Sequence, residues 1–222
     1  MRGKIGPWSG GAQGDANSYP NIVVTGTPGT GKSTLAAQIA ESYTTPSGAA
    51  PLRHIDVGAL VKAQGFHVSY DHEWESYEVD EDRLLDYLEP LTGEFAPGPA
   101  DTDRDACAAA ARVADDDDTR GGLILDWHTC DAWPERWADL VIVLRCDHQL
   151  LWSRLEKRGY KEKKIAENNE AEIMGVVAEE ARESYVPEAI VTLTSESSAE
   201  MDENLDRVVA WVHAWRRDRG LE

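Results

Sequence analysis

The chain has 222 residues, which suits one α/β domain with a sizeable core and makes a two-domain split a poor fit. Its 41 acidic and 22 basic residues give a formal net charge of -19, which argues against a surface built to bind nucleic acid or an anionic membrane. A basic partner fits this charge better; acidity that merely maintains solubility is the alternative.

Cysteine usage and hydropathy indicate an intracellular, soluble protein. The three cysteines, Cys107, Cys130 and Cys146, are odd in number and lack metal-binding spacing, so we expect neither a disulfide framework nor a zinc site. The apolar run from Leu140 to Leu144 is far too short to span a bilayer, and the N-terminus lacks the apolar core of a signal peptide. We therefore expect no membrane partner.

Residues 1 to 19 are rich in glycine, serine and small polar groups and are interpreted as a flexible N-terminal extension. A single domain is expected over residues 20 to 222. Within it, apolar stretches alternate with helical patterns, and the strand candidates are residues 22–25, 52–56, 123–126, 140–144 and 190–193. This alternation predicts a parallel sheet with helices on both faces.

The segment from Gly26 to Ser33, GTPGTGKS, fits the phosphate-binding loop pattern G-x-x-x-x-G-K-[ST] between a predicted strand and a predicted helix. Glycines such as Gly29 and Gly31 let successive N–H groups face phosphate oxygens, and the helix adds its positive end. Lys32 would reach the terminal phosphates, and Ser33 would hold Mg²⁺. A glycine-rich turn that carries a lysine by chance is the alternative.

Residues 92 to 120 interrupt the alternation with glycine, proline, an alanine run and four consecutive aspartates, and they are interpreted as an acidic surface insertion. Residues 106 to 113 are long enough for a short helix. The aspartates at 115 to 118 repel one another and should stay solvated, so we expect no metal site there.

A second chemical signal is the buried strand that ends in Asp126 and continues into Trp127 and His128. Ligands bind at the carboxyl ends of parallel strands, so Asp126 would lie beside the phosphate-binding loop as an acid that supports Mg²⁺. Capping of the strand-to-helix turn is its alternative role. His128 would orient water or relay a proton, with no role as the equal alternative. The remaining histidines lack this context, and we assign them no role: His54, His67, His72, His148 and His213.

Arg154 and Arg158 lie four residues apart in a predicted helix that ends at Gly159, so they share one helix face. Two guanidinium groups there can stack on a base and clamp a phosphate; a solvated helix face is the alternative. The charged residues 161 to 168 are predicted to form a short exposed segment that closes over ATP as a lid. A final helix has one apolar face that should pack on the sheet, formed by Met201, Leu205, Val208, Val209, Val212 and Trp215.

Together these segments resemble the adenylate kinase isoenzyme 6 family, whose members are also described as coilin-interacting nuclear ATPases and small-subunit ribosome assembly factors. The resemblance runs from residue 20 to about residue 217 without the acidic insertion, and no NKxD element for guanine is present. Its most specific carriers are the Asp-aromatic-His element at Asp126 to His128 and the Pro-Glu-Arg-Trp run at Pro134 to Trp137. Further carriers are residues 20–21, 26–34, 56–58, 79–82, 131, 158–160, 163–165 and 167–168.

The resemblance implies a nucleoside monophosphate kinase fold with a five-stranded parallel core, an AMP-binding segment over 56–79 and a lid over 158–168. It implies the reaction ATP + AMP ⇌ 2 ADP with Mg²⁺, ATP hydrolysis, and a role in small ribosomal subunit maturation and 18S rRNA processing in nucleus and cytoplasm. The expected site residues are Lys32, Asp126, His128 and Arg158 for catalysis; Gly29, Gly31, Lys32, Ser33, Thr34, Arg154 and Arg158 for ATP; Asp56 and Lys62 for AMP; and Ser33 and Asp126 for the metal.

Partners implied by the resemblance are the pre-40S particle and a small-subunit ribosomal protein with a basic tail, while direct RNA contact should not dominate. Acidic residues near the AMP segment would receive such a tail by charge complementarity: Glu73, Glu75, Glu78, Asp80, Glu81 and Asp82. The equal alternative is that they solvate this segment and stabilise the N-terminus of the following helix.

The chain also departs from ordinary adenylate kinases. An Asp-Gly-Phe-Pro-Arg element is replaced by residues 126 to 130, Lys62 stands where an arginine would bind the AMP phosphate, and residues 167 to 170 lack further arginines. A lysine cannot bind the AMP phosphate through two parallel hydrogen bonds as an arginine does. With fewer cations around the transferring phosphoryl group, electrostatic stabilisation of the transition state should be weaker. Two alternatives follow: an ATP-switched assembly chaperone, or a metabolic kinase for another acceptor.

Overall fold

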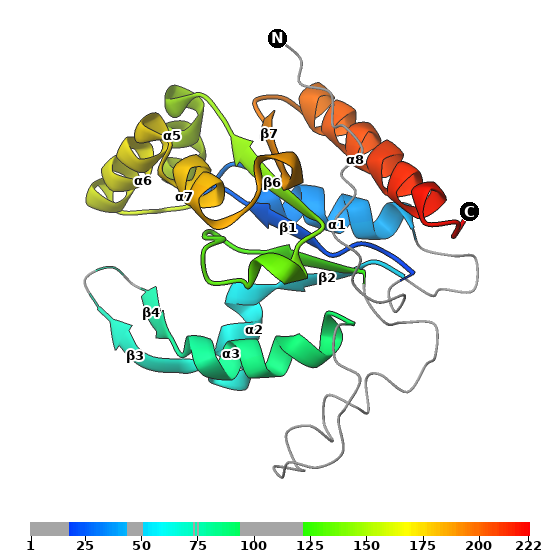
Figure 1. The fold of residues 1–222 in the computed structure, drawn as a ribbon. Helices are drawn as coiled ribbons and strands as arrows, with labels where there is room; N and C mark the ends of the chain where they lie inside the picture. Colours follow the sequence, from blue (N-terminus) through cyan, green and yellow to red (C-terminus); the bar gives the residue numbers. More distant parts are fainter. Residues whose placement is uncertain (1–17, 44–50, 73, 75, 94–121) are drawn as a thin grey trace.

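The computed structural model describes residues 18–43, 51–72, 74, 76–93 and 122–222 (Figure 1). A five-stranded parallel sheet with the order β2-β5-β1-β6-β7 lies at its centre. Its strands are β1 (Ile22–Thr25), β2 (Arg53–Asp56), β5 (Leu123–Asp126), β6 (Leu140–Arg145) and β7 (Ile190–Thr194). The predicted parallel sheet is confirmed, and each strand bound lies within one residue of its prediction.

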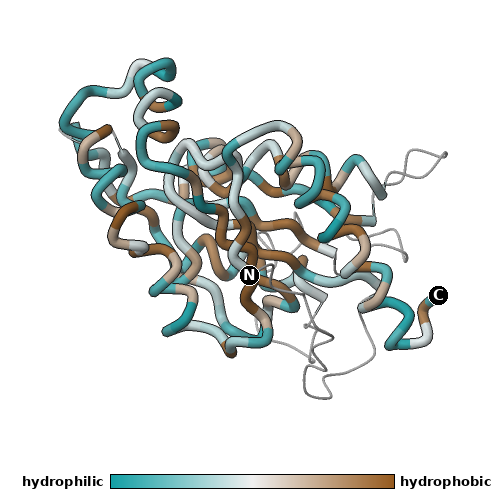
Figure 2. Tube along the Cα trace, turned by 90° about the horizontal axis from the view of Figure 1, so that it is seen from above, coloured by the Kyte–Doolittle hydropathy of each residue, from teal (hydrophilic) through white to brown (hydrophobic). Residues whose placement is uncertain are grey.

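Helices cover both faces of the sheet, as predicted (Figure 1). Side chains alternate along β1, so Ile22 and Val24 pack into one apolar cluster while Val23 packs into the other. The first cluster includes side chains of α1 (Lys32–Ser42) and α8 (Ser198–Asp218). The second includes those of α2 (Val57–Gln64), α3 (Glu81–Leu88) and α7 (Val176–Ser184). Figure 2 shows the apolar strands enclosed between more polar helices.

The apolar face predicted for the last helix is confirmed in α8. Met201, Val208, Val212 and Trp215 are buried against the sheet and α1, and Leu205 is partly buried beside them, whereas Val209 is half-buried outside this cluster. The helix begins where the Ser197 side chain accepts a hydrogen bond from the N–H of Glu200 at 3.2 Å. Burial of this stripe fixes α8 on the sheet rather than making it a binding surface.

A small antiparallel hairpin stands apart from the central sheet and was not predicted from the sequence. It consists of β3 (His67–Asp71) and β4 (Ser76–Val79) and lies between α2 and α3 in the chain (Figure 1). Its residues are mostly exposed, and its connection contains none of the Asn-Gly or Asp-Gly dipeptides that mark a hairpin in a sequence. The hairpin therefore carries no strong sequence signal.

The segment predicted as a short exposed lid is instead the first part of a longer helix. After α5 (His148–Lys157), α6 runs over Glu162–Met174. The prediction of exposure is wrong for Ile165, which is buried against Leu151 and Leu155 of α5. Residues three or four apart on α6 form this buried face, and two of them, Asn169 and Glu172, are polar. An apolar stripe that contains polar residues is hard to recognise in a sequence.

Short 3₁₀ turns complete the fold at η1 (Glu89–Leu91), η2 (Glu135–Trp137) and η3 (Pro187–Ala189). Tyr19 packs edge-on against Tyr43, with ring centroids 6.1 Å apart, and lies 4.1 Å beneath the Arg216 guanidinium, so packing begins just before residue 20.

Most of the predicted extension, residues 1–17, and most of the predicted insertion, residues 94–121, lie outside the described residues. So do Cys107, the predicted helix over 106–113 and the four aspartates.

Cys130 and Cys146 are buried, unbonded thiols, and burial raises the pKa of both above the ordinary range. Throughout the part of the chain that the structure describes, no helix is long and apolar enough to cross a membrane. The same residues contain no group of three or more histidine, cysteine, aspartate or glutamate side chains arranged to hold a metal ion.

Candidate active site

The phosphate-binding loop connects β1 to α1, and its glycines are required by its shape. Gly26, Gly29 and Gly31 have φ angles of 143°, 102° and 99°, a region that other residues rarely adopt. A Cβ atom on Gly26 would lie 2.4 Å from the carbonyl oxygen of Leu144. Gly31 is the N-cap of α1 and has no side chain to accept a hydrogen bond. The first N–H groups of the helix therefore remain available to a ligand at the loop. This arrangement suits an anion.

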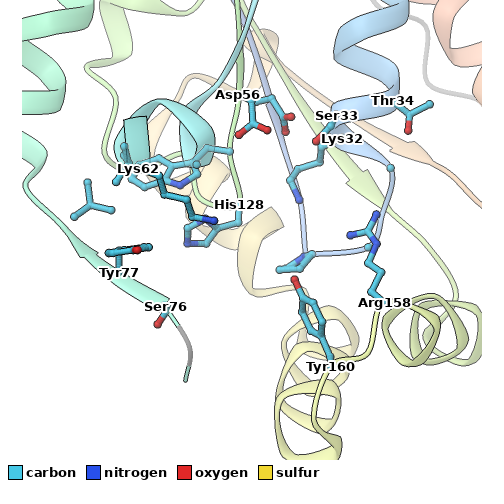
Figure 3. Close-up of a pocket in the computed structure, with 18 of the residues that line it drawn as sticks. Lys32, Ser33, Thr34, Asp56, Lys62, Ser76, Tyr77, His128, Arg158 and Tyr160 are labelled. Atoms are coloured by element: carbon cyan, nitrogen blue, oxygen red, sulfur yellow. The ribbon is translucent and has the colours of Figure 1, made fainter. Parts of the chain in front are cut away.

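A cavity of about 770 Å³ opens in front of this loop (Figure 3). Figure 3 shows Lys62 and His128 on one side of Lys32 and Arg158 on the other. Ten of the eleven residues predicted for the site line it: Gly29, Gly31, Lys32, Ser33, Thr34, Asp56, Lys62, Asp126, His128 and Arg158. Residues that are up to 129 positions apart in the sequence, from Gly29 to Arg158, therefore meet in one concavity.

Two carboxylates lie side by side at the carboxyl end of the sheet, because Asp56 of β2 pairs in register with Asp126 of β5. Asp56 caps α2, and its Oδ1 accepts a hydrogen bond from the N–H of Ala59 at 2.9 Å. Asp126 is only 4% exposed, and its Oδ2 lies 3.3 Å from Nε2 of His54. Asp56 is thus the cap of α2, and His54, which has no role in the sequence prediction, contacts Asp126.

Oxygen donors suited to a magnesium ion converge on the cavity. Ser33 is the second residue of α1, and Asp126 is the last residue of β5, next to Asp56; both line the cavity. Hydroxyl and carboxylate oxygens are the ligands that Mg²⁺ prefers when it also binds substrate phosphates. The donor set fits the predicted metal.

Lys32 is held inside the loop, where its Nζ lies 3.3 Å from the carbonyl oxygen of Thr27. Burial lowers the pKa of Lys32 from 10.5 to about 8, and Arg158 acts in the same direction. Asp126, Glu172 and Asp56 oppose this shift. A bound phosphate would favour the charged ammonium further, because an anion nearby stabilises a cation.

His128 lies at the end of β5 on the wall of the cavity, edge-on to Trp127 with ring centroids 5.2 Å apart. The residue is exposed, yet the surrounding protein atoms desolvate the imidazole and lower the pKa of His128. Lys32 and Lys164 lower it further, against the opposing effect of Asp131. The imidazole is therefore neutral near pH 7 and can accept a proton.

The two predicted arginines have different environments. Arg158 follows the last residue of α5 and lines the cavity. Arg154 does not line it: its guanidinium donates hydrogen bonds to the carbonyl oxygens of Ser195 at 2.8 Å and of Gly29 and Glu196 at 3.3 Å each. Arg154 thereby ties the turn between β7 and α8 to the outside of the phosphate-binding loop. A contact with ATP stays a prediction for Arg154.

The side of the cavity opposite the phosphate-binding loop is formed by the hairpin. Tyr70 and Tyr77 line it and pack edge-on, with ring centroids 4.9 Å apart. In the connection between the two hairpin strands, the carbonyl oxygen of Trp74 accepts a hydrogen bond from Lys164 Nζ of α6 at 2.6 Å, and Lys163 lies 4.2 Å above the Trp74 ring. These aromatic residues were not predicted as site residues. The only indication in the sequence is that aromatic residues recur within a charged stretch.

Sequence reasoning also missed a buried carboxylate behind the loop. Glu172 of α6 is 4% exposed and contacts Thr27, the second residue of the phosphate-binding loop, with 2.6 Å between Thr27 Oγ1 and Glu172 Oε2. Arg145, at the end of β6, pairs with the same carboxylate at 2.9 Å. A charged residue within the buried face of α6 was the available signal.

The sequence matches a family model and several curated proteins over most of its length. Residues 22–175 match the AAA domain family. The chain is 45% identical over 204 residues to the adenylate kinase isoenzyme 6 homolog of Schizosaccharomyces pombe, covering 92% of this chain and 98% of that protein. It is 38% identical to the Caenorhabditis elegans homolog, with 91% and 94% covered, and 39% identical to the Saccharomyces cerevisiae homolog FAP7, with 90% and 86% covered.

Proposed function

The chain belongs to the adenylate kinase isoenzyme 6 family, and from that premise we propose that it is an ATP-dependent nucleoside monophosphate kinase that converts ATP and AMP into two ADP. The observation that carries this proposal is the distribution of cations in one cavity. Lys32 and Arg158 lie at the phosphate-binding loop, and Lys62 enters from α2. A hydrolase needs to bind one phosphorylated substrate, whereas cations on both sides of the cavity suit two phosphorylated substrates.

The proposed roles follow from position. The loop amides and Lys32 bind the β- and γ-phosphates of ATP, and Arg158 adds positive charge at the transferring group. Ser33 and Asp126 would hold Mg²⁺, whose charge neutralises phosphate oxygens. Lys62 binds the AMP phosphate and brings it into line for attack. Residues 56–79, which include the hairpin, form the proposed AMP-binding segment, and residues 158–168, which include the start of α6, form the proposed lid.

We also propose ATP hydrolysis in the same cavity, with His128 orienting the attacking water. A neutral imidazole on the cavity wall supports this role, because it can accept a proton from the water as phosphate is attacked. Hydrolysis and transfer share the phosphate-binding loop and differ in the nucleophile.

A role in small ribosomal subunit maturation, in nucleus and cytoplasm, is the further proposal, with a basic ribosomal protein tail as partner. The net charge of -19 supports it. The described acidic residues near the AMP segment have local partners as well: Asp80 caps α3, Glu81 and Asp82 occupy its first turn, and Glu78 accepts a hydrogen bond from Ser69 at 2.6 Å. Glu73 and Glu75 lie outside the described residues.

The second candidate function is an ATP-switched assembly chaperone with little kinase activity. Lys62 favours it, because a lysine holds the acceptor phosphate without the bidentate fork of an arginine. In this alternative, ATP occupancy changes the placement of α6 and thereby the affinity for a partner.

Substitution of Lys62 tests the kinase proposal. Lys62→Met should raise the KM for AMP by about tenfold or more, since a hydrogen bond to a charged group is lost, and leave the KM for ATP within about twofold. Lys62→Arg should lower the KM for AMP. Lys157→Met, at an exposed position of α5 outside the cavity, is the matched control. Equal changes in both KM values for Lys62→Met, or none in either, would refute the assignment.

A further inference from the structure

Glu172 is a buried carboxylate, and both of its oxygens accept hydrogen bonds. Its Oε1 accepts hydrogen bonds from Arg145 Nε at 2.9 Å and from the N–H of Cys146 at 3.2 Å, and its Oε2 accepts one from the Thr27 hydroxyl at 2.6 Å. Arg145 also donates to the main-chain carbonyl of Glu172. Burial of a carboxylate is costly unless it is paired and hydrogen-bonded, and these contacts meet that condition.

Thr27 is the residue around which the phosphate-binding loop closes. Its side chain is held by Glu172, and its carbonyl oxygen accepts hydrogen bonds from the N–H of Thr30 at 3.2 Å, from the Thr30 hydroxyl at 2.9 Å and from Lys32 Nζ at 3.3 Å. The side chain and the carbonyl belong to one residue with 2% exposure. A displacement of Thr27 therefore displaces the oxygen that holds the Lys32 ammonium.

The helix that carries Glu172 also contacts the hairpin, whose strands line the cavity opposite the phosphate-binding loop. Lys164, eight residues earlier on α6, donates to the carbonyl oxygen of Trp74 in the hairpin connection at 2.6 Å. At 1.5 Å per residue, the two positions are about 12 Å apart along the helix axis. One rigid element thus contacts the phosphate-binding loop at one end and the acceptor side of the cavity at the other.

We propose that Glu172 is a positioning residue: through the Thr27 hydroxyl it fixes the phosphate-binding loop with Lys32 in place for phosphoryl transfer, and it links the geometry of this loop to the placement of α6. Glu172 does not line the cavity: it contacts the loop through the Thr27 hydroxyl, and its negative charge also raises the pKa of Lys32. The proposal rests on the proposed function for its kinetic consequences. Its competitor is a purely structural role, in which Glu172 and Arg145 anchor α6 to β6 without effect on the loop.

The two roles separate at Thr27 rather than at Glu172, since Glu172→Ala would leave Arg145 unpaired and risk unfolding. Thr27→Val removes the hydroxyl with almost no change in shape and leaves the Glu172–Arg145 pair in place. Thr27→Ser keeps the hydroxyl and is the conservative rescue. For these variants, kcat, both KM values, the dissociation constant for ATP and the thermal unfolding midpoint would be measured.

We expect Thr27→Val to lower kcat by about tenfold, the scale of one hydrogen bond to a charged group, with the KM for AMP within about twofold. Thr27→Ser should recover most of kcat. A kcat within twofold of the wild type for Thr27→Val, or an equal loss in Thr27→Ser, would overturn the proposal. A lower unfolding midpoint without a change in kcat would establish the structural role instead.

A second pair of variants, with substitutions on α6, tests the coupling between Glu172 and Thr27. Glu172→Gln removes the charge but keeps an acceptor for Arg145, and Glu170→Gln removes the same charge from an exposed position of the helix. We expect a severalfold lower kcat for Glu172→Gln alone, and a smaller effect of Thr27→Val in the Glu172→Gln background than in the wild type. Additive effects would overturn the coupling.

Failure of the proposed function can be distinguished from failure of this inference. If the wild type shows no AMP-dependent turnover, the dissociation constant for ATP still reports the loop geometry. It should then rise by about tenfold in Thr27→Val and stay near the wild-type value in Thr27→Ser. An unchanged ATP affinity in Thr27→Val would overturn the positioning role in that case.

Discussion

At the residue scale, similar side chains in and around the cavity have different tasks because their environments differ. Asp56 caps a helix while its in-register neighbour Asp126 is buried beside His54. Arg158 faces the cavity, whereas Arg154 binds main-chain carbonyls behind it. Such pairs look alike in a sequence, and only packing separates them.

Replacement of His128 tests its proposed part in hydrolysis. His128→Ala should lower the rate of phosphate release by about tenfold or more, because the proton acceptor for the attacking water is lost. The dissociation constant for ATP should stay within about twofold, since the phosphate-binding loop is unchanged. His213→Ala, on the exposed face of α8, is the control. A loss of ATP binding as large as the loss of hydrolysis would contradict the role.

The motif residues could be predicted because each depends on local geometry. Gly29 and Gly31 are needed wherever a loop takes these φ angles, and Asp126 follows from a strand that ends at the ligand-binding edge of a parallel sheet. Glu172 and His54 could not be predicted, because their roles arise from contacts across 145 and 72 positions of the chain. Glu172 does not belong to a motif, and the charged position on the buried face of α6 does not by itself reveal the partner Thr27.

At the scale of elements, the strands and α8 follow from apolar patterns, whereas the hairpin and α6 do not. Ile165, Asn169 and Glu172 form the buried face of α6, and two of the three are polar. The exposed tyrosines of β3 and β4 face a cavity rather than a core. Elements that build a polar site therefore lack the hydrophobic periodicity on which prediction from sequence depends.

The contact between α6 and the hairpin is expected to exclude water from the cavity. Lys164→Ala removes the hydrogen bond to the Trp74 carbonyl and should loosen the contact between α6 and the hairpin, which would admit water to the cavity. We expect a lower rate of AMP-dependent ADP formation and a ratio of phosphate release to transfer that is higher by about twofold or more. Both products would be measured in one assay, with Lys157→Ala as control. An unchanged ratio would show that this contact does not control water access.

At the scale of the whole molecule, the net charge of -19 is the dominant electrostatic feature. Of the acidic residues proposed to receive a basic tail, Asp80 caps α3 and Glu78 accepts a hydrogen bond within the hairpin, and reception of such a tail stays a prediction. We propose that this charge acts as a long-range field that attracts a basic chain to the surface and repels polyanions.

Ionic strength tests that field. A peptide rich in lysine and arginine should bind with a dissociation constant that rises by about tenfold or more from low to about 0.5 M salt, because screening shortens the range of the attraction. An acidic peptide of equal length should not bind at any salt concentration. Calorimetry at several salt concentrations would measure this, and salt-independent binding of the basic peptide would refute an electrostatic partner surface.

The central claim, that one cavity transfers phosphate from ATP to AMP, is tested most directly by product-resolved ATP turnover with Mg²⁺, with and without AMP. Lys32→Ala controls for a contaminating enzyme, because loss of the loop ammonium should abolish both transfer and hydrolysis. We predict that AMP accelerates ATP consumption and that ADP accumulates without matching phosphate release. Phosphate release equal to ATP loss, with no effect of AMP, would contradict the kinase assignment and favour an ATP-switched assembly factor.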